Sequence, residues 1–291
     1  MLCIICIICI ICIKLYFVKN NTNRDKCAFI TAIYSSYEKS CKPFVQQQLV
    51  DVDFICFTDI EIENTNGWII DKTPYHIDNT SALDDGTFVN SLKNNQHPFN
   101  IAKYYKQQFH NIPRLKKYKY IVWIDGTISI TNKYCAHETI LYLQQHQLVT
   151  WSHEFRNGLL INEVNSSTGS DKYNKPFWNG FKQPIQNVKQ QYDDYLKLGY
   201  DEQYWRKLRK PNPNYGVWIT CFIGFNMNHI KTNYFLNEWY LHTLKYTTQD
   251  QVSFPFVLRL LKIHPLTLPN TNVNGKPHTK TDWYVKKAHG K

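Results

Sequence analysis

The strongest constraint on the fold is the segment formed by residues 118–125, Tyr-Lys-Tyr-Ile-Val-Trp-Ile-Asp. The residues just before the acid are uniformly apolar, which is typical of a central strand that is buried on both faces. Such strands occur in sheets that helices cover on both sides. We therefore predict an α/β fold with a mainly parallel central sheet flanked by helices. Ligands bind these sheets in the crevice at the carboxyl ends of the strands, so Asp125 marks the predicted site.

Further apolar runs extend this sheet on the N-terminal side. Residues 27–34 and 52–59 are rich in β-favouring side chains, and the segment 43–50 between them has helical character. This spacing predicts a β-α-β unit with parallel strands. Residues 68–70 supply a third strand, and the Asn-, Asp- and Ser-rich stretch 78–96 is predicted to be a long loop.

The rest of the chain alternates between helical and strand patterns. Apolar residues from Asn100 onward recur at helical spacing, and Pro98 lies where the start of a helix tolerates proline. The other predicted elements are strands at 148–151 and 218–225 and helices at 136–146, 185–198, 232–244 and 249–261. We expect residues 27–265 to form one domain and residues 266–291 to form a basic, irregular tail.

Residues 1–26 differ from the rest of the chain. They consist of an apolar Cys-Ile-Ile repeat followed by a polar linker. Residues 2–18 lie at the lower length limit of a membrane-spanning helix, so they are expected to act as a signal-anchor. The protein would then be membrane-associated, in the secretory pathway or on host membranes. The alternative is a spurious upstream start codon, in which case the protein is cytoplasmic.

Basic residues outnumber acidic residues in this chain. Lys and Arg total 34 against 23 Asp and Glu, which gives a net charge of +11. Such a surface attracts anions such as nucleoside diphosphates, nucleic acid or acidic glycans. The densest basic runs, residues 114–119 and 206–210, fall short of a dedicated nucleic-acid patch. We therefore expect no specific nucleic-acid partner.

The pair formed by Asp125 and Gly126 suits a phosphorylated ligand. A carboxylate at a strand end can bind a divalent cation that neutralises a diphosphate, and a glycine after it lets the backbone approach the ligand. The competing interpretation is a plain Asp-Gly turn that joins two strands. The residue pattern by itself leaves both interpretations open.

Four segments, in a fixed order, resemble a known family. They are Asn-Ile-Ala-Lys-Tyr-Tyr-Lys at 100–106, Tyr-Ile-Val-Trp-Ile-Asp-Gly at 120–126, Ser-His-Glu-Phe-Arg at 152–156 and Thr-Gln-Asp-Gln-Val-Ser-Phe at 248–254. Over roughly residues 27–265 the chain resembles a family of plant, bacterial and viral glycosyltransferase-like proteins, long catalogued as a domain of unknown function. Its plant members include mucilage-related and turgor-regulation-defect proteins.

This resemblance implies a GT-A-like fold and a glycosyltransferase. The implied reaction moves a sugar from a nucleotide-sugar donor to a glycan, protein or lipid acceptor. A divalent metal, Mn²⁺ or Mg²⁺, is implied at Asp125, with Thr127 where many such folds carry a second aspartate. His264 is the implied late metal ligand, because many GT-A enzymes use a C-terminal histidine in this way.

The resemblance also implies donor-binding residues. Lys103 and Lys106 lie one helical turn apart and are expected to direct their ammonium groups to the donor phosphates, beside Gly126. His153 and Arg156 form a polar cluster directly after an apolar run, which suits phosphate or acceptor contacts.

Two acids are candidates for the catalytic base. Asp250 could remove a proton from an acceptor hydroxyl, and Glu154 is its rival, with Glu163 as a further acid. The competing interpretation of Asp250 is structural, because a carboxylate at the start of a helix caps free backbone amides.

Two functions of other classes stay open. A metal-bound water near Asp125 could hydrolyse a lipid amide, an activity described for one plant member of the family, a ceramidase. The chain, however, contains no His-x-x-x-His pair and no Gly-x-Ser-x-Gly elbow. A non-catalytic glycan-binding module would use the aromatic residues, which make up 15% of the chain, but it needs no acid at the end of a buried strand.

Overall fold

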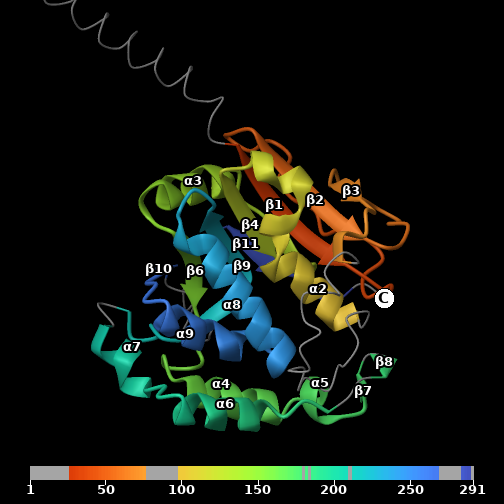
Figure 1. Ribbon diagram of the computed structural model, residues 1–291. Coiled ribbons are helices and arrows are strands. Elements are labelled where there is room, and N and C mark those ends of the chain that lie inside the picture. The colour runs from red at the N-terminus through yellow and green to blue at the C-terminus, as the bar shows by residue number, and fades with distance from the viewer. Residues whose placement is uncertain are drawn as a thin grey trace, which may run out of the picture.

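A seven-stranded sheet forms the centre of the molecule, in the order β10-β6-β9-β4-β1-β2-β3 (Figure 1). The computed structural model describes residues 26–76, 98–178, 181–182, 185–208, 212–268 and 283–289. Strand β9 runs antiparallel to its neighbours β4 and β6, and the other pairings are parallel. The predicted α/β fold with a mainly parallel sheet is therefore confirmed. The strands are β1 (Cys27–Ile33), β2 (Val52–Thr58), β3 (Ile69–Asp71), β4 (Tyr120–Ile124), β6 (Leu148–Ser152), β9 (Trp218–Asn226) and β10 (Leu266–Leu268).

Helices cover one face of the sheet, and a helix with a small sheet covers the other (Figure 1). Helices α2 (Pro98–Gln107), α8 (Lys231–Lys245) and α9 (Asp250–Leu260) pack together on the first face. The second face carries α3 (Cys135–Gln145) and the antiparallel pair β5 (Ile128–Ile130) and β11 (Tyr284–Lys286). This arrangement places α2 and α9 beside the carboxyl end of β4.

The side chains of β4 explain why this strand is apolar throughout. Ile121 and Trp123 belong to the hydrophobic cluster under α2 and α8. Tyr120, Val122 and Ile124 belong to the cluster on the opposite face. Because successive side chains of a strand point to opposite faces, a strand covered on both sides needs apolar residues at every position.

Shorter helices lie at the carboxyl end of the sheet, in the lower part of Figure 1. Predicted helices 136–146, 185–198, 232–244 and 249–261 are confirmed as α3, α6, α8 and α9, with ends that shift by a few residues. The confirmed helix α6 spans Val188–Lys197. The elements that the sequence did not predict are α4 (Leu160–Thr168), α5 (Asp171–Asn174), α7 (Glu202–Leu208), the strand pair β7 (Phe177–Trp178) and β8 (Phe181–Lys182), and two 3₁₀ helices, Phe109–Asn111 and Pro113–Lys117.

The helix predicted for residues 43–50 is wrong. This segment is irregular, with a single bridge between Phe44 and Ile130. The Val45 amide donates to the Ile130 carbonyl at 3.1 Å, and the Leu49 amide donates to the Lys133 carbonyl at 3.1 Å. These tertiary hydrogen bonds satisfy backbone groups that a helix would have paired internally, so the parallel strands β1 and β2 are joined without a helix.

The C-terminal tail is more ordered than the sequence predicts. Strand β10 extends the central sheet along β6, and β11 pairs with β5, with Tyr284 opposite Ile130. Trp283 and Tyr284 are buried in the cluster on the second face. Two buried aromatic side chains thus anchor a segment whose composition suggests an irregular structure.

Two sequence predictions fall on residues outside the described ranges. They are the long loop at 78–96 and the signal-anchor within residues 2–18. In the portion of the chain that the structure does describe, no helix has both the length and the apolar character needed to cross a membrane.

Candidate active site

Asp125 lies where the central strand β4 ends. Its amide donates to the Cys221 carbonyl of β9 at 2.9 Å, which fixes the backbone at the sheet edge. The indole Nε1 of Trp123 donates to Asp125 Oδ1 at 2.8 Å. The Asp125 side chain is 43% exposed, so the carboxylate is held on one side by the protein and is open on the other.

The Asp-Gly pair forms a turn, but this turn does not make a hairpin. The Ile128 amide donates to the Asp125 carbonyl at 2.9 Å, and β5 then leaves the central sheet to pair with β11. A Cβ atom added at Gly126 would meet Ile33 at 3.5 Å, which is ordinary van der Waals contact. The fold alone therefore does not require glycine at this position.

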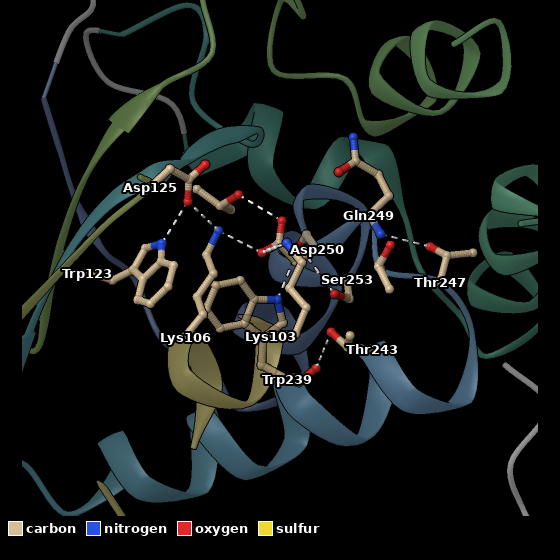
Figure 2. A network of polar contacts seen from close by, with 12 residues as sticks. Lys103, Lys106, Trp123, Asp125, Trp239, Thr243, Thr247, Gln249, Asp250 and Ser253 are labelled. Atoms are coloured by element: carbon tan, nitrogen blue, oxygen red, sulfur yellow. Dashed lines mark hydrogen bonds and ion pairs between the residues drawn. The ribbon is translucent and has the colours of Figure 1, made fainter. Parts of the chain in front are cut away.

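Two lysines and two aspartates form a continuous ion-pair network behind the sheet edge (Figure 2). Lys103 and Lys106 of α2 each place Nζ 2.7 Å from Asp250 Oδ2. Lys106 Nζ also lies 3.5 Å from Asp125 Oδ1, so it bridges the two carboxylates. Asp250 is separated from Lys103 by 147 residues, and the packing of α2 against α8 and α9 brings them together.

Buried groups hold Asp250 in place. Thr220 donates its hydroxyl to Asp250 Oδ1 at 2.9 Å, and the Trp239 indole donates to the Asp250 carbonyl at 3.1 Å. Asp250 is the first residue of α9, but the helix has no side-chain cap at Gln249, and both Asp250 oxygens bond elsewhere. The carboxylate therefore anchors lysines and does not cap the helix.

Lys106 lines the cavity but is almost completely buried. The side chain is 2% exposed, and Nζ lies 5.7 Å from the ring centroids of both Trp123 and Trp239. A cation is attracted to the face of an aromatic ring, and the attraction is strongest where water is excluded. Lys106 is thus a fixed buried charge, whereas Lys103 is 15% exposed.

These contacts shift the pKa values of all four groups. Burial opposes ionisation of Asp125, but the Lys106 and Lys103 charges outweigh it and leave the Asp125 pKa lowered. Burial likewise opposes ionisation of Asp250, yet Lys103 and Lys106 hold its pKa far below the usual range. Burial lowers the Lys103 pKa despite Asp250, whereas Asp125 and Asp250 outweigh burial and raise the Lys106 pKa. Both aspartates are therefore anionic at neutral pH.

A cavity of about 330 Å³ opens in front of Asp125. Ligand pockets in proteins have volumes from about 300 to 1,000 Å³, so this one accepts a small phosphorylated ligand or part of a larger one. Of the predicted site residues, Lys103, Lys106, Asp125, Gly126 and Thr127 line it. The other lining residues are Ala32, Ile33, Tyr34, Tyr37, Glu38, Phe99, Ala102, Trp123, Lys172, Thr248, Lys286 and His289.

Four of these polar lining residues were missed by the sequence analysis. Lys172 comes from α5, Glu38 follows β1, and Lys286 and His289 belong to the C-terminal segment. His289 Nδ1 lies 2.5 Å from Glu38 Oε1, which ties that segment to the rim of the cavity. The tail carries many basic residues, but no spacing in it distinguishes Lys286 from its neighbours.

The other predicted site residues lie elsewhere. Arg156 Nε donates to Glu163 Oε2 at 2.5 Å, and His153 Nε2 lies 3.8 Å from the same oxygen. This cluster is distinct from the residues that line the cavity. Glu154 lies between His153 and Arg156 in the sequence and is within electrostatic range of Tyr284. The catalytic role of Glu154 and the ligand contacts of His153 and Arg156 stay predictions.

The residues at the strand end do not fit a divalent cation. Mg²⁺, for example, takes six oxygen ligands, usually one or two carboxylates together with waters and substrate phosphates. Asp125 Oδ1 and both oxygens of Asp250 already accept hydrogen bonds from lysine, indole or hydroxyl groups. His264, the implied late ligand, is exposed, packs against Trp205 of α7, and is not a lining residue. Across the described ranges, no group of three or more His, Cys, Asp or Glu could hold a metal.

The fold and this site define an α/β domain with a charged cavity at the carboxyl end of β4. Residues 19–274 match the family described as TOD1/MUCI70, glycosyltransferase-like domain, and the chain belongs to that family. A search of the curated proteins finds no match.

Among solved structures, the chain is similar to the apo structure of the WbbM bifunctional glycosyltransferase, with 13% sequence identity and a TM-score of 0.42. The alignment covers 81% of this chain and 37% of that one, so the chain spans just over a third of its length.

Proposed function

We propose that the protein is a glycosyltransferase that uses a nucleoside-diphosphate sugar and binds it in the cavity at the end of β4. The observation that carries this proposal is the network of Lys103, Lys106, Asp125 and Asp250 at the carboxyl edge of a mainly parallel sheet. It places fixed charges beside a cavity large enough for a phosphorylated ligand. Family membership supports the same reaction class.

In the proposed reaction, an acceptor hydroxyl oxygen forms a bond to the anomeric carbon of the donor sugar. The bond from that carbon to the diphosphate oxygen breaks, the nucleoside diphosphate leaves, and the hydroxyl proton passes to a base. Negative charge grows on the leaving diphosphate, and preorganised positive charges stabilise it most effectively where water is excluded. Lys103 and Lys106 supply such charges, because Asp250 fixes both ammonium groups at 2.7 Å.

We assign Asp250 a positioning role in this reaction. Its oxygens are engaged by two lysines and Thr220, and its strongly lowered pKa makes it a weak base. Glu154 is the other base predicted from the sequence. The acceptor is a glycan, protein or lipid, and membrane association through residues 2–18 is part of the proposal.

No observation favours the hydrolase alternative. That reaction needs a water activated by a bound metal. Trp123 and Lys106 already engage Asp125 Oδ1, and the described residues contain no group of three or more His, Cys, Asp or Glu that could hold a metal.

The first test is thermal stabilisation of the full chain by a panel of nucleosides, nucleoside diphosphates and nucleotide sugars. A ligand that binds the folded state alone stabilises it by about 2.7 kcal/mol at a hundredfold excess over Kd. We expect one nucleoside diphosphate and its sugar to stabilise the protein, and the matching nucleoside to have little effect. If no member of the panel stabilises the protein, either in EDTA or in Mn²⁺, the proposed function is wrong.

The rate of sugar transfer by an Asp125 variant tests the role of this residue directly. We expect Asp125→Asn to lower the transfer rate about a hundredfold, because the charge that draws Lys106 toward the cavity is lost. The fold should persist, since Asn keeps an acceptor for the Trp123 indole. The matched control is Asp193→Asn on the surface of α6, where Asp193 pairs with Lys189. Equal rates in the two variants would contradict the assignment of Asp125.

A further inference from the structure

We infer that the cavity binds the diphosphate of its ligand through Lys103, Lys106, Lys172 and Lys286, without a divalent cation. This inference rests on the proposed function and names the chemistry by which that site holds its donor. It assigns ligand contacts to Lys172 and Lys286, which come from two elements distant in the sequence.

The carboxylates at the cavity are already neutralised by the protein. Lys106 lies 3.5 Å from Asp125 Oδ1, where it would repel a cation bound to that carboxylate. The other lining carboxylate, Glu38, has Oε2 at 2.9 Å from Lys42 Nζ and Oε1 bonded to His289. Asp125 leaves only Oδ2 open, beside the Lys106 charge, and both oxygens of Glu38 are engaged, so the two acids do not offer convergent oxygens for Mg²⁺ or Mn²⁺.

Positive charge, in contrast, is in excess at the cavity. Among the described residues that line it, four are lysines and two, Asp125 and Glu38, are acids. When buried Asp250 is included, these four lysines face three described carboxylates, and one of the three, Glu38, is also paired with Lys42 outside this set. A cleft lined by one sign of charge concentrates the opposite sign, and lysine is a common point-charge partner of phosphate.

Lys172 shows the effect of placing several positive charges close together. Its Nζ lies over the rings of Phe99 and Tyr173, at 5.8 and 5.4 Å from their centroids. Burial, followed by the nearby Lys103 charge, lowers the pKa of Lys172 to about 8. The negative charge of a bound diphosphate would offset the repulsion between the Lys103 and Lys172 ammonium groups. It would therefore favour the charged form of Lys172.

This gives an expected pH dependence. Lys172 is mostly protonated at pH 7 and mostly neutral at pH 9, so diphosphate affinity should fall across this interval. The charged groups that act on Lys172 include Lys103 and Lys106 of α2, Asp125 after β4 and Asp250 of α9. Calorimetric titrations at several pH values should give a shallower fall for Lys172→Gln. Identical pH profiles for the two proteins would contradict the role of Lys172.

The decisive experiment measures binding of nucleoside diphosphates and of inorganic pyrophosphate to the full chain by calorimetry, in EDTA and in Mn²⁺. We expect binding in EDTA, weakened about tenfold or more by Lys286→Ala or Lys172→Ala through the loss of one charged contact. The matched control is Lys287→Ala: Lys287 has the same charge, is the next residue in the chain and does not line the cavity. Its affinity should stay within about twofold of the wild type.

The outcomes separate the two proposals. Binding that disappears in EDTA and returns with Mn²⁺ would overturn the inference and leave the proposed function intact. An equal loss of affinity in Lys286→Ala and Lys287→Ala would also overturn it, because the effect would then be general charge attraction. If no nucleoside diphosphate or nucleotide sugar binds with or without Mn²⁺, the proposed function fails as well.

Discussion

Replacement of Asp250 by alanine is expected to lower the free energy of unfolding by about 3–5 kcal/mol, the cost of removing one partner from a buried ion pair. Asp250 is 2% exposed and is the shared partner of Lys103 and Lys106. Without it, both ammonium groups stay largely buried with only Asp125 to compensate them. Urea unfolding of the wild type and the variant at pH 7 measures this difference.

Two further variants make this prediction specific. Asp193→Ala removes a half-exposed ion pair with Lys189 on α6 and should cost no more than about 1 kcal/mol. Lys106→Met in the Asp250→Ala background should restore part of the lost stability, because it removes a buried, unpaired charge. A loss in Asp250→Ala that is no larger than in Asp193→Ala would show that the network contributes little.

The same carboxylate predicts how stability depends on pH. The pKa of Asp250 is lower in the folded protein than in the unfolded chain, so the folded state binds fewer protons there. Its contribution is fully present above the ordinary aspartate pKa of about 4 and is lost progressively as the pH falls below that value. The difference between wild type and Asp250→Ala should therefore shrink on acidification, which urea unfolding at several pH values tests.

The second large effect is expected for Trp283→Ala, which should also cost about 3–5 kcal/mol of unfolding free energy. Trp283 is 5% exposed, and its ring centroid lies 5.4 Å from Trp151 and 5.8 Å from Phe222. Its indole also donates to Glu138. Truncation would leave a cavity between α3 and the central sheet and would remove the anchor of β11.

This variant links the stability of the tail to ligand binding. Loosening of β11 would displace Lys286 from the cavity, so the affinity for diphosphate should fall together with stability. Trp283→Phe keeps most of the aromatic packing and should lose less of both. If Trp283→Ala unfolds at the same urea concentration as the wild type, the tail is not part of the folded core.

The sequence by itself determined the central strand and the position of Asp125 at its end. The apolar run at 121–124 is a local pattern that only a strand covered on both faces requires. Local patterns also predicted other elements. Short apolar runs predicted the strands β1, β2, β3, β6 and β9, and apolar residues at helical spacing predicted the helices α2, α3, α6, α8 and α9. The family resemblance, which rests on these segments, was likewise present in the sequence and is confirmed.

The tertiary structure alone decided which charges meet. Lys103 and Lys106 share a helix face, but their partner Asp250 lies far along the chain and reaches them because α2, α8 and α9 pack on one face of the sheet. Lys172 and Lys286 enter the cavity from polar segments with no distinguishing pattern. Tertiary structure also decided the conformation of segment 43–50. Its backbone hydrogen bonds to the β5 region override the helical character of the local sequence. Charge pairs and tertiary hydrogen bonds depend on distances in space, and a linear sequence records only the order of residues.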